Sequence, residues 1–311
     1  PSEPVCTATG RPWSIDGTPV AVQFGGQIHP FSALALAEDW AAEQTLTETL
    51  DAPQIPPTAE SPYTEGRKRF LLMRVDFPDY QVDAFPTNNA VNHMRDMSNF
   101  LAEISYYKHI IAPVGQGTDI TPLMRMSENA AAYDNAGLSK LYPEGRDVAR
   151  TNYGYDLSKY DFCFVCTGGK PAYGYAGLGY VGGVGYHLAN GYFDVRTSAH
   201  EFGHNLGLGH ANWLDTGGHS TIGPGSNEEY GDSFDTMGGS GGGIRHFSAS
   251  FKNRLGWIPN SDAITVTTSG IYRLHAHDIA TAPIGLRALR LNRSSGDPYW
   301  IEFRQLWTGN K

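Results

Sequence analysis

The stretch from His200 to His210 constrains this chain more than any other, because it reads H-E-x-x-H-x-x-G-x-x-H. On a helix, His200 and His204 are four residues apart and therefore lie on one face, one turn apart. Two imidazoles at that spacing can bind one metal ion. Glu201 would lie beside the ion, where it can take a proton from a water that the ion activates. The stretch therefore predicts a metal site built on a helix.

The second half of the stretch supplies an exit from the helix and a third ligand. Glycine tolerates the left-handed conformation that ends a helix, so Gly207 provides the exit. The chain then turns and brings back His210. Three neutral imidazoles plus one water form the open tetrahedral site of a catalytic zinc. We predict a Zn²⁺ held by His200, His204 and His210. The alternative is a helix with two solvated histidines and a glycine cap.

A methionine in a tight turn is expected downstream of such a site, and Asp-Thr-Met-Gly-Gly at 235–239 supplies Met237. Together these features resemble the metzincin zinc peptidases. The flanking residues are most similar to the gametolysin family, on the segments E-Y-G-D at 229–232, F-S-A at 247–249 and R-L-G-W at 254–257, and on Ala211. The resemblance extends over residues 68–260.

The resemblance implies a zinc endopeptidase with an α+β fold. Its metzincin-like catalytic domain would have a mixed twisted sheet, an active-site helix and a Met-turn, with a β subdomain after it. Met237 would form an apolar floor under the ligands without binding the metal. Astacin-like and serralysin-like enzymes carry an oxyanion-assisting tyrosine two residues after this methionine, and this chain has Gly239 there. The substrate would be an extracellular matrix or cell-wall protein, and the enzyme would be secreted.

Composition excludes several other classes. The chain has 311 residues, 40% hydrophobic and 18% charged, with a net charge of -9. Because it has no basic tract, nucleic acid is a poor partner. No apolar run approaches the ~20 residues of a membrane span. The chain begins at Pro1 without a signal peptide, as expected of a processed or trimmed form, so this does not argue against secretion.

Three cysteines are present. Cys163 and Cys166 lie on an expected strand and face opposite sides of it, so we predict two buried thiols and no bridge between them. Cys6 precedes the catalytic region. It is either a free thiol, a disulfide partner, or a ligand that occupies the fourth zinc position and keeps the enzyme latent.

Three regions are expected along the chain. Residues 1–66 form an N-terminal extension or pro-like segment, with a helix over 32–50 and a proline-rich linker over 52–62. Residues 67–260 form the catalytic domain. Residues 261–311 form a small β-rich subdomain with strands at 263–267, 270–274, 287–291 and 299–303. The abrupt end at Lys311 is compatible with a truncated subdomain.

Within the catalytic region, hydrophobic patterns predict strands over 68–77, 108–114 and 160–167 and helices over 87–107 and 138–153. The first helix should bury a stripe of Val91, Met94, Ser98, Leu101 and Ile104. Strands that alternate with helices indicate a sheet layered with helices.

The glycine-rich segment 168–191 has no G-x-G-x-x-G between a strand and a helix, so it is a poor phosphate loop. The resemblance implies an edge strand that pairs with extended substrate, and glycines would let the peptide approach closely. The alternative is a flexible surface loop. Asp194 should cap the active-site helix, which we expect to run from about 195 to 208.

The loop between His210 and Met237 holds two further candidates. His219 is a rival third ligand, although His210 has the expected spacing. The acidic residues Glu228, Glu229, Asp232 and Asp235 are suited either to binding Ca²⁺ or to capping turns and pairing with Arg245 or Arg254. Their spacing is not that of an EF-hand, which favours the structural role.

Two other functions remain open at this point. One is a latent zymogen, in which residues 1–66 lie across the cleft. The other is a non-catalytic zinc-containing module for binding or adhesion. Glu201 argues against the second, because a structural zinc site has no need of a general base and is normally closed by a fourth protein ligand.

Overall fold

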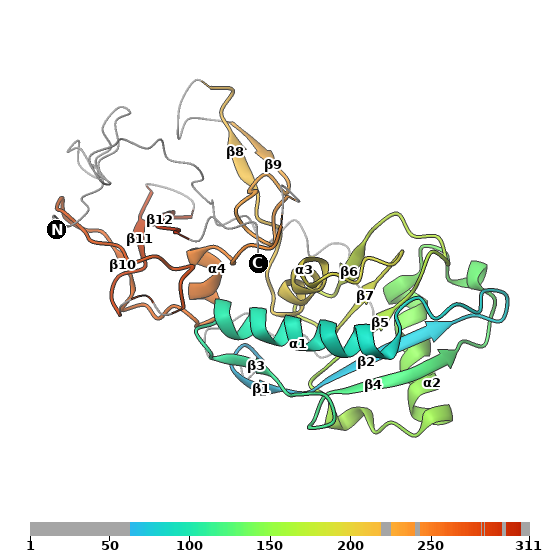
Figure 1. Ribbon diagram of the computed structural model, residues 1–311. Coiled ribbons are helices and arrows are strands. Elements are labelled where there is room, and N and C mark those ends of the chain that lie inside the picture. The colour runs from blue at the N-terminus through green and yellow to red at the C-terminus, as the bar shows by residue number, and fades with distance from the viewer. Residues whose placement is uncertain are drawn as a thin grey trace. The chain divides into compact units, whose positions relative to one another are not determined.

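The computed structural model describes residues 63–218, 225–239, 243–280, 282, 284–293 and 297–305. The expectations for Cys6, the helix over 32–50, the linker over 52–62 and His219 lie outside these residues. Backbone contacts divide the described residues into two compact units. One holds 63–209 and Leu255–Trp257, and the other holds 210–254 and the residues from 258 onward. Helices and several separate sheets give an α+β fold (Figure 1).

A five-stranded sheet forms the centre of the first unit. Its strands lie in the order β4-β2-β5-β7-β6, and β6 is antiparallel to β7 while the other neighbours are parallel. The strands are β2 (Phe70–Asp76), β4 (Asp119–Arg125), β5 (Phe162–Cys166), β6 (Gly177–Gly179) and β7 (Gly185–Leu188). The strands expected over 68–77 and 160–167 are confirmed.

Sequence reasoning missed β4, which carries Pro122. Proline cannot donate to a strand ladder and is rare inside sheets. Here β4 is an edge strand, and its register with β2 shifts between Leu72 and Arg74, whose partners are Ile120 and Leu123. The irregularity accommodates the proline without breaking the pairing.

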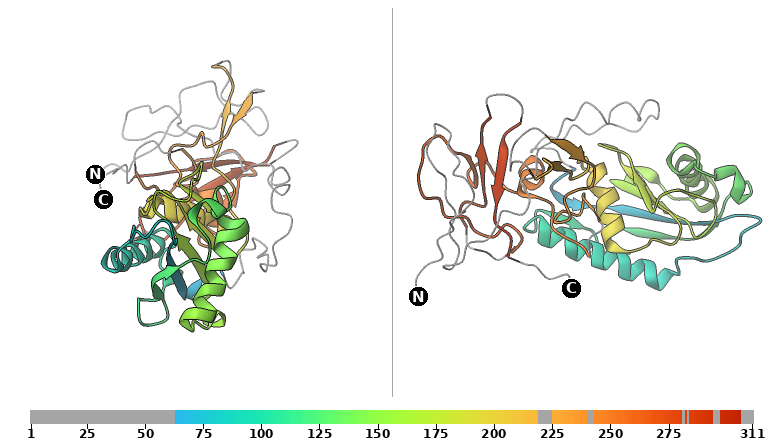
Figure 2. Two further views of the ribbon diagram at one scale, coloured as in Figure 1. Left: turned by 90° about the vertical axis from the view of Figure 1, so that its right-hand side faces the viewer. Right: turned by 90° about the horizontal axis from the view of Figure 1, so that it is seen from above.

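Alternation along β2 produces a core on each face of the sheet. Leu71, Met73 and Val75 pack in one cluster with residues of α2 (Tyr142–Tyr153). Phe70 points the other way and meets Phe202 of α3 (Val195–Asn205), with ring centroids 5.2 Å apart. Within this unit α2 therefore covers one face of the sheet, while α1 (Thr87–Ile104) and α3 cover the other (Figure 2).

Helix α1 begins where expected and ends at Ile104, three residues before the predicted end at 107, and its buried stripe needs one correction. Val91 is exposed, and the buried positions are Ala90, His93, Met94, Met97, Leu101 and Ile104. The buried stripe therefore begins at Ala90, one residue before the predicted Val91. Short helical turns at Ala130–Tyr133, Gly137–Leu141 and Leu157–Lys159 complete the helical part, and the second of these leads into α2.

The strand expected over 108–114 is shorter than predicted. Only β3 (His109–Ile111) forms, paired in parallel with β1 (Gly66–Lys68). The cysteine prediction is confirmed, because Cys163 and Cys166 are both buried and free on β5. Among the described residues, no helix has the length and apolar character needed to cross a bilayer.

The second unit contains a hairpin, a short helix and a three-stranded sheet. Its elements are β8 (Trp213–Asp215), β9 (Ser226–Glu228), α4 (Ala249–Arg254), β10 (Ala263–Thr265), β11 (Ala288–Leu291) and β12 (Tyr299–Glu302). The sheet order is β10-β11-β12. Three of the four strands expected after residue 262 are therefore present.

The strand expected over 270–274 is wrong. Tyr272 donates its hydroxyl to the carbonyl of Thr268, and Ile271 is 90% exposed. Tyr272 and Leu274 still pack against Val266 and its neighbours, so the segment contributes apolar side chains and no ladder. Alternating side chains make a strand only where the backbone also pairs with a neighbouring strand.

A buried ionic network ties the second unit together. The Glu302 carboxylate accepts hydrogen bonds from Arg304 (2.5 Å) and from the Ala249 amide (2.6 Å), and lies 3.2 Å from His277. Burial raises the pKa of Glu302, but Arg304 and His277 outweigh it and hold that pKa well below the usual range. Arg304 also donates to the carbonyl of Phe234, in the turn before Met237.

Candidate metal centre

Helix α3 is held at its N-terminus and along the side that faces the sheet. Asp194 caps its N-terminus by accepting a hydrogen bond from the Thr197 amide (2.8 Å), as predicted. On the sheet side, Ser198 bonds to His93 of α1 (3.1 Å) and to Tyr186 of β7 (2.7 Å). The helix is therefore fixed by polar contacts on the residues just before the H-E-x-x-H segment.

The helix ends three residues earlier than expected, at Asn205. Gly207 has a φ of 87°, in the left-handed region, and its amide donates to the His204 carbonyl (2.8 Å). A residue with a Cβ adopts that conformation only with strain. The chain turns there and leads to His210.

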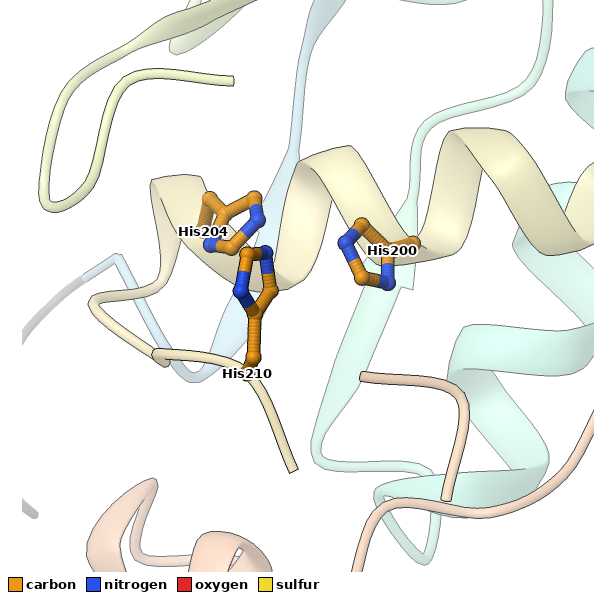
Figure 3. A group of neighbouring side chains, drawn as sticks. All are labelled: His200, His204 and His210. Carbon is orange, nitrogen blue, oxygen red and sulfur yellow. The ribbon is translucent and has the colours of Figure 1, made fainter. Parts of the chain in front are cut away.

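Three imidazoles converge at this point. His200 and His204 project from the same side of α3, and His210 projects toward them from the following loop (Figure 3). One ring nitrogen from each lies within 4.8 Å of the others. His200 and His204 are buried, and His210 is partly exposed. Three histidines could thus bind a single metal ion.

The second ring nitrogens of two of these histidines are engaged elsewhere. His204 Nδ1 donates to the carbonyl of Leu208 (2.8 Å), and His210 Nδ1 donates to Oε1 of Glu229 (2.8 Å). An Nδ1–H that is held by an oxygen leaves Nε2 as the lone-pair donor for a metal. Metal-binding histidines commonly hold their other ring nitrogen in this way, so these three residues could hold a metal ion.

Glu229 and Tyr230 both contact the His210 ring. The Tyr230 ring lies 3.8 Å from the His210 ring, tilted by 33°. Tyr230 has a φ of 59°, an uncommon conformation for a bulky residue. Sequence reasoning placed Glu229 in an acidic cluster and did not connect it with His210, because 19 residues separate the two.

The turn around Met237 is bonded to the residue that follows His210. The Ala211 amide donates to the Met237 carbonyl (2.9 Å), and the Asp232 amide donates to the Ala211 carbonyl (3.1 Å). Asp235 accepts from the amides of Met237 (2.8 Å) and Ser248 (2.6 Å). Met237 is fully buried. Its role as a floor under the ligands remains a prediction.

Two of the four acidic residues before Met237, Asp232 and Asp235, accept hydrogen bonds within the turn. Asp232 accepts from the Phe234 amide (2.8 Å) and Asp235 from two amides, as capping carboxylates do. Burial and the neighbouring Asp232 raise the pKa of Asp235 to about 7, against the charge of Arg304. Burial raises the pKa of Asp232 as well, and the charge of Arg304 again opposes this. The predicted pairing of these acidic residues with Arg245 or Arg254 stays a prediction.

Gly239, two residues after Met237, has little room for a side chain. A Cβ there would lie 2.8 Å from the carbonyl oxygen of Tyr230. That carbonyl belongs to the residue that stacks on His210. The glycine is thus explained by close packing of the chain beside the third histidine.

Glu201 lies against the edge strand of the sheet. It is 5% exposed and packs under β6, whose Gly179 amide donates a hydrogen bond to its carboxylate. Burial raises the pKa of Glu201 to about 8, although the Gly179 amide and the charge of Arg196 oppose this. The carboxyl is therefore placed in a dry site beside the histidine cluster of its own helix.

The glycine-rich segment is ordered over 177–188, where the loop alternative is wrong. It forms β6 and β7, and β6 is an edge of the five-stranded sheet. The expected reason for its glycines needs correction. Gly177 and Gly179 are required by the close approach of α3, since a Cβ at either position would lie 2.5 Å from atoms of Glu201.

Comparisons with known proteins add little to this geometry. No family model matches the chain, and no curated protein matches it. Among solved structures, the chain is similar to one described as "Structure of a chaperone-substrate complex", at 20% identity and a TM-score of 0.38. The similarity covers 60% of this chain and 33% of that one, so it spans about a third of the other chain's length. A likeness at this level carries no conclusion about function.

Proposed function

We propose that this protein is a secreted zinc-dependent endopeptidase of the metzincin type, most similar to the gametolysin family, and that it hydrolyses peptide bonds of extracellular proteins. One observation carries the proposal. Nitrogens of His200, His204 and His210 lie within 4.8 Å of one another. Helix α3, which carries the first two histidines, also carries the buried carboxylate of Glu201. A structural zinc site is normally closed by four protein ligands and needs no such base.

In this proposal His200, His204 and His210 hold the metal, and Leu208 and Glu229 fix the rings of the last two. Bound Zn²⁺ supplies Lewis acidity at the scissile carbonyl and lowers the pKa of water toward ~7. Glu201 accepts a proton from the attacking water and then delivers it to the leaving amine. Oxyanion assistance from a tyrosine two residues after Met237 is absent, because Gly239 stands there.

The edge strand β6 supports a mode of substrate binding. Among the described strands, none pairs with its outer side, and Leu178 is 40% exposed between two glycines that face α3. An extended peptide could add to this edge by main-chain pairing, which places few demands on side chains. Extracellular matrix or cell-wall proteins are the substrate class that the family resemblance suggests.

The test is cleavage of a quenched fluorescent protein substrate by the full chain. It is run with and without a zinc chelator, before and after trace trypsin. Chelator-sensitive cleavage without trypsin supports an active endopeptidase. Cleavage only after trypsin supports a latent zymogen. A zinc-loaded chain that stays inactive in both states would refute the peptidase proposal and favour the binding module.

Glu201→Ala separates catalysis from metal binding. Glu201 is next to the three proposed ligands but is not itself a ligand. This variant should therefore keep its zinc and lose nearly all cleavage. Zinc content is measured by atomic absorption on the same preparation. Full proteolysis by zinc-loaded Glu201→Ala would contradict the assignment of Glu201 as general base.

A further inference from the structure

Edge strand β6 approaches helix α3 more closely than ordinary side chains allow. Gly177 lies over the Glu201 side chain, and a Cβ there would be 2.5 Å from both Cγ and Oε1. Ordinary van der Waals contact begins at 3.4 Å. A methyl group at position 177 would therefore have to push the Glu201 carboxylate away by about 1 Å.

The second glycine of the strand makes a different contact. A Cβ at Gly179 would lie 2.5 Å from the backbone oxygen of Glu201 and 3.1 Å from Cβ of His204. The Gly179 amide donates a hydrogen bond to the Glu201 carboxylate. One glycine thus limits where the carboxylate can go, and the other supplies a donor that holds it there.

The hairpin that carries these glycines is anchored to the same helix. Asn205, at the end of α3, donates its side-chain amide to the carbonyls of Tyr180 (2.9 Å) and Gly185 (2.8 Å). The Gly182 amide donates to the His204 carbonyl (2.8 Å). These three bonds fix the β6–β7 turn against the C-terminal end of α3, so β6 cannot withdraw without breaking them.

We propose that the backbone of Gly177-Leu178-Gly179 is a positioning clamp for Glu201, which sets its carboxylate in the orientation that the reaction uses. The inference rests on the proposed function, because it assigns a purpose to Glu201 as base. Misplacing a catalytic group by about 1 Å can cost about 100-fold in rate. Gly177 and Gly179 act through Glu201 and are positioning residues.

Gly177→Ala is the direct test. In the full chain loaded with Zn²⁺, we expect kcat to fall about 100-fold while KM changes by less than about 2-fold, because only the base is displaced. The affinity for Zn²⁺ should change by less than about 2-fold, since the three atoms that a Cβ at position 177 would meet first all belong to Glu201 and none to a histidine. A crystal structure of the variant should show the Glu201 carboxylate displaced by about 1 Å.

Two other glycines provide matched comparisons. Gly174→Ala lies three residues earlier, and a Cβ there would meet nothing within 4 Å, so kcat, KM and zinc affinity should stay within about 2-fold of the parent. Gly179→Ala would press on the backbone of α3 and on His204. It should therefore weaken zinc binding and lower the melting temperature as well as kcat.

The outcomes separate the clamp from the peptidase proposal. If the parent cleaves substrate and Gly177→Ala cleaves it with the same kcat, the clamp is wrong and the peptidase stands. If the zinc-loaded parent is inactive both before and after trypsin, the peptidase proposal fails. The crystal structures then decide the clamp alone. A Glu201 carboxylate in the same place in both chains overturns it, and a displaced one supports it.

Discussion

Removal of the Glu229 carboxylate should weaken metal binding, because an oxygen of this carboxylate orients the ring of His210. Its Oε1 lies 2.8 Å from Nδ1 of His210. Loss of an outer-shell partner typically costs 10–100-fold in metal affinity. The Glu229 side chain is 63% exposed, so solvent screens its charge, and we expect Glu229→Ala to lie at the lower end, about 10-fold or about 1.4 kcal/mol.

A neutral replacement divides this effect between charge and hydrogen bonding. Glu229→Gln retains an acceptor oxygen but loses the charge, and a charge-assisted hydrogen bond is roughly twice as strong as a neutral one. The expected loss for this variant is therefore about half as large in free energy, or about 3-fold in affinity. Tyr230 stays on the ring in both variants, so packing is unchanged.

The assay is competition for Zn²⁺ against a chromogenic chelator at fixed ionic strength. Glu228→Ala is the control, because Glu228 is the adjacent carboxylate and accepts from the Ser226 hydroxyl (2.9 Å). It should bind Zn²⁺ like the parent. If Glu229→Ala and Glu228→Ala bind equally well, the orienting role of Glu229 is refuted, and any loss common to both reflects net charge.

Two further predictions concern stability. Burial lowers the pKa of His93 from 6.5 to about 4, so the unfolded chain takes up this proton at a higher pH than the folded chain does. The neutral His93 ring therefore contributes its full share of the unfolding free energy above pH ~6.5, and about 3 kcal/mol of it is lost as the pH falls to ~4. Burial lowers the pKa of His109, His187 and His277 in the same direction, so urea unfolding with chelator present should show the sum of these effects. His93→Gln should make the slope less steep by the share of one proton, and an equally steep slope in the variant would refute the contribution of His93. Glu302→Gln should destabilise the chain by about 3–5 kcal/mol, because it leaves Arg304 buried without its partner. Replacing both residues with methionine should recover much of that loss, and no recovery in thermal unfolding would mean that the carboxylate matters mainly as a cap for α4.

Part of the fold follows from patterns within a few turns of chain. Helix α1 was predictable from its apolar stripe, and β2 and β5 from short apolar runs with charged or turn residues around them. The errors arose where pairing partners decide the outcome. Position 122 reads as a strand breaker, yet an edge strand with a shifted register accepts proline. The segment 270–274 reads as a strand, yet it joins none of the described sheets.

Local patterns in the sequence are enough to predict the parts of the site that lie within one helix and its end. The spacing of His200 and His204, the cap at Asp194 and the left-handed turn at Gly207 are set by interactions within one or two helical turns, which a linear pattern encodes. His210 follows the turn closely enough for the same reasoning to place it beside the other two.

Only the tertiary structure decided what surrounds these groups. Glu229 reaches His210 across 19 residues, and Gly177 and Gly179 reach Glu201 from a strand that precedes α3. These contacts depend on how distant segments of the chain fold back to the site. The spacing of residues along the sequence does not predict such contacts. The physical reason is that ligand spacing is a property of one helix, whereas ring orientation and carboxylate position are properties of the packed neighbours.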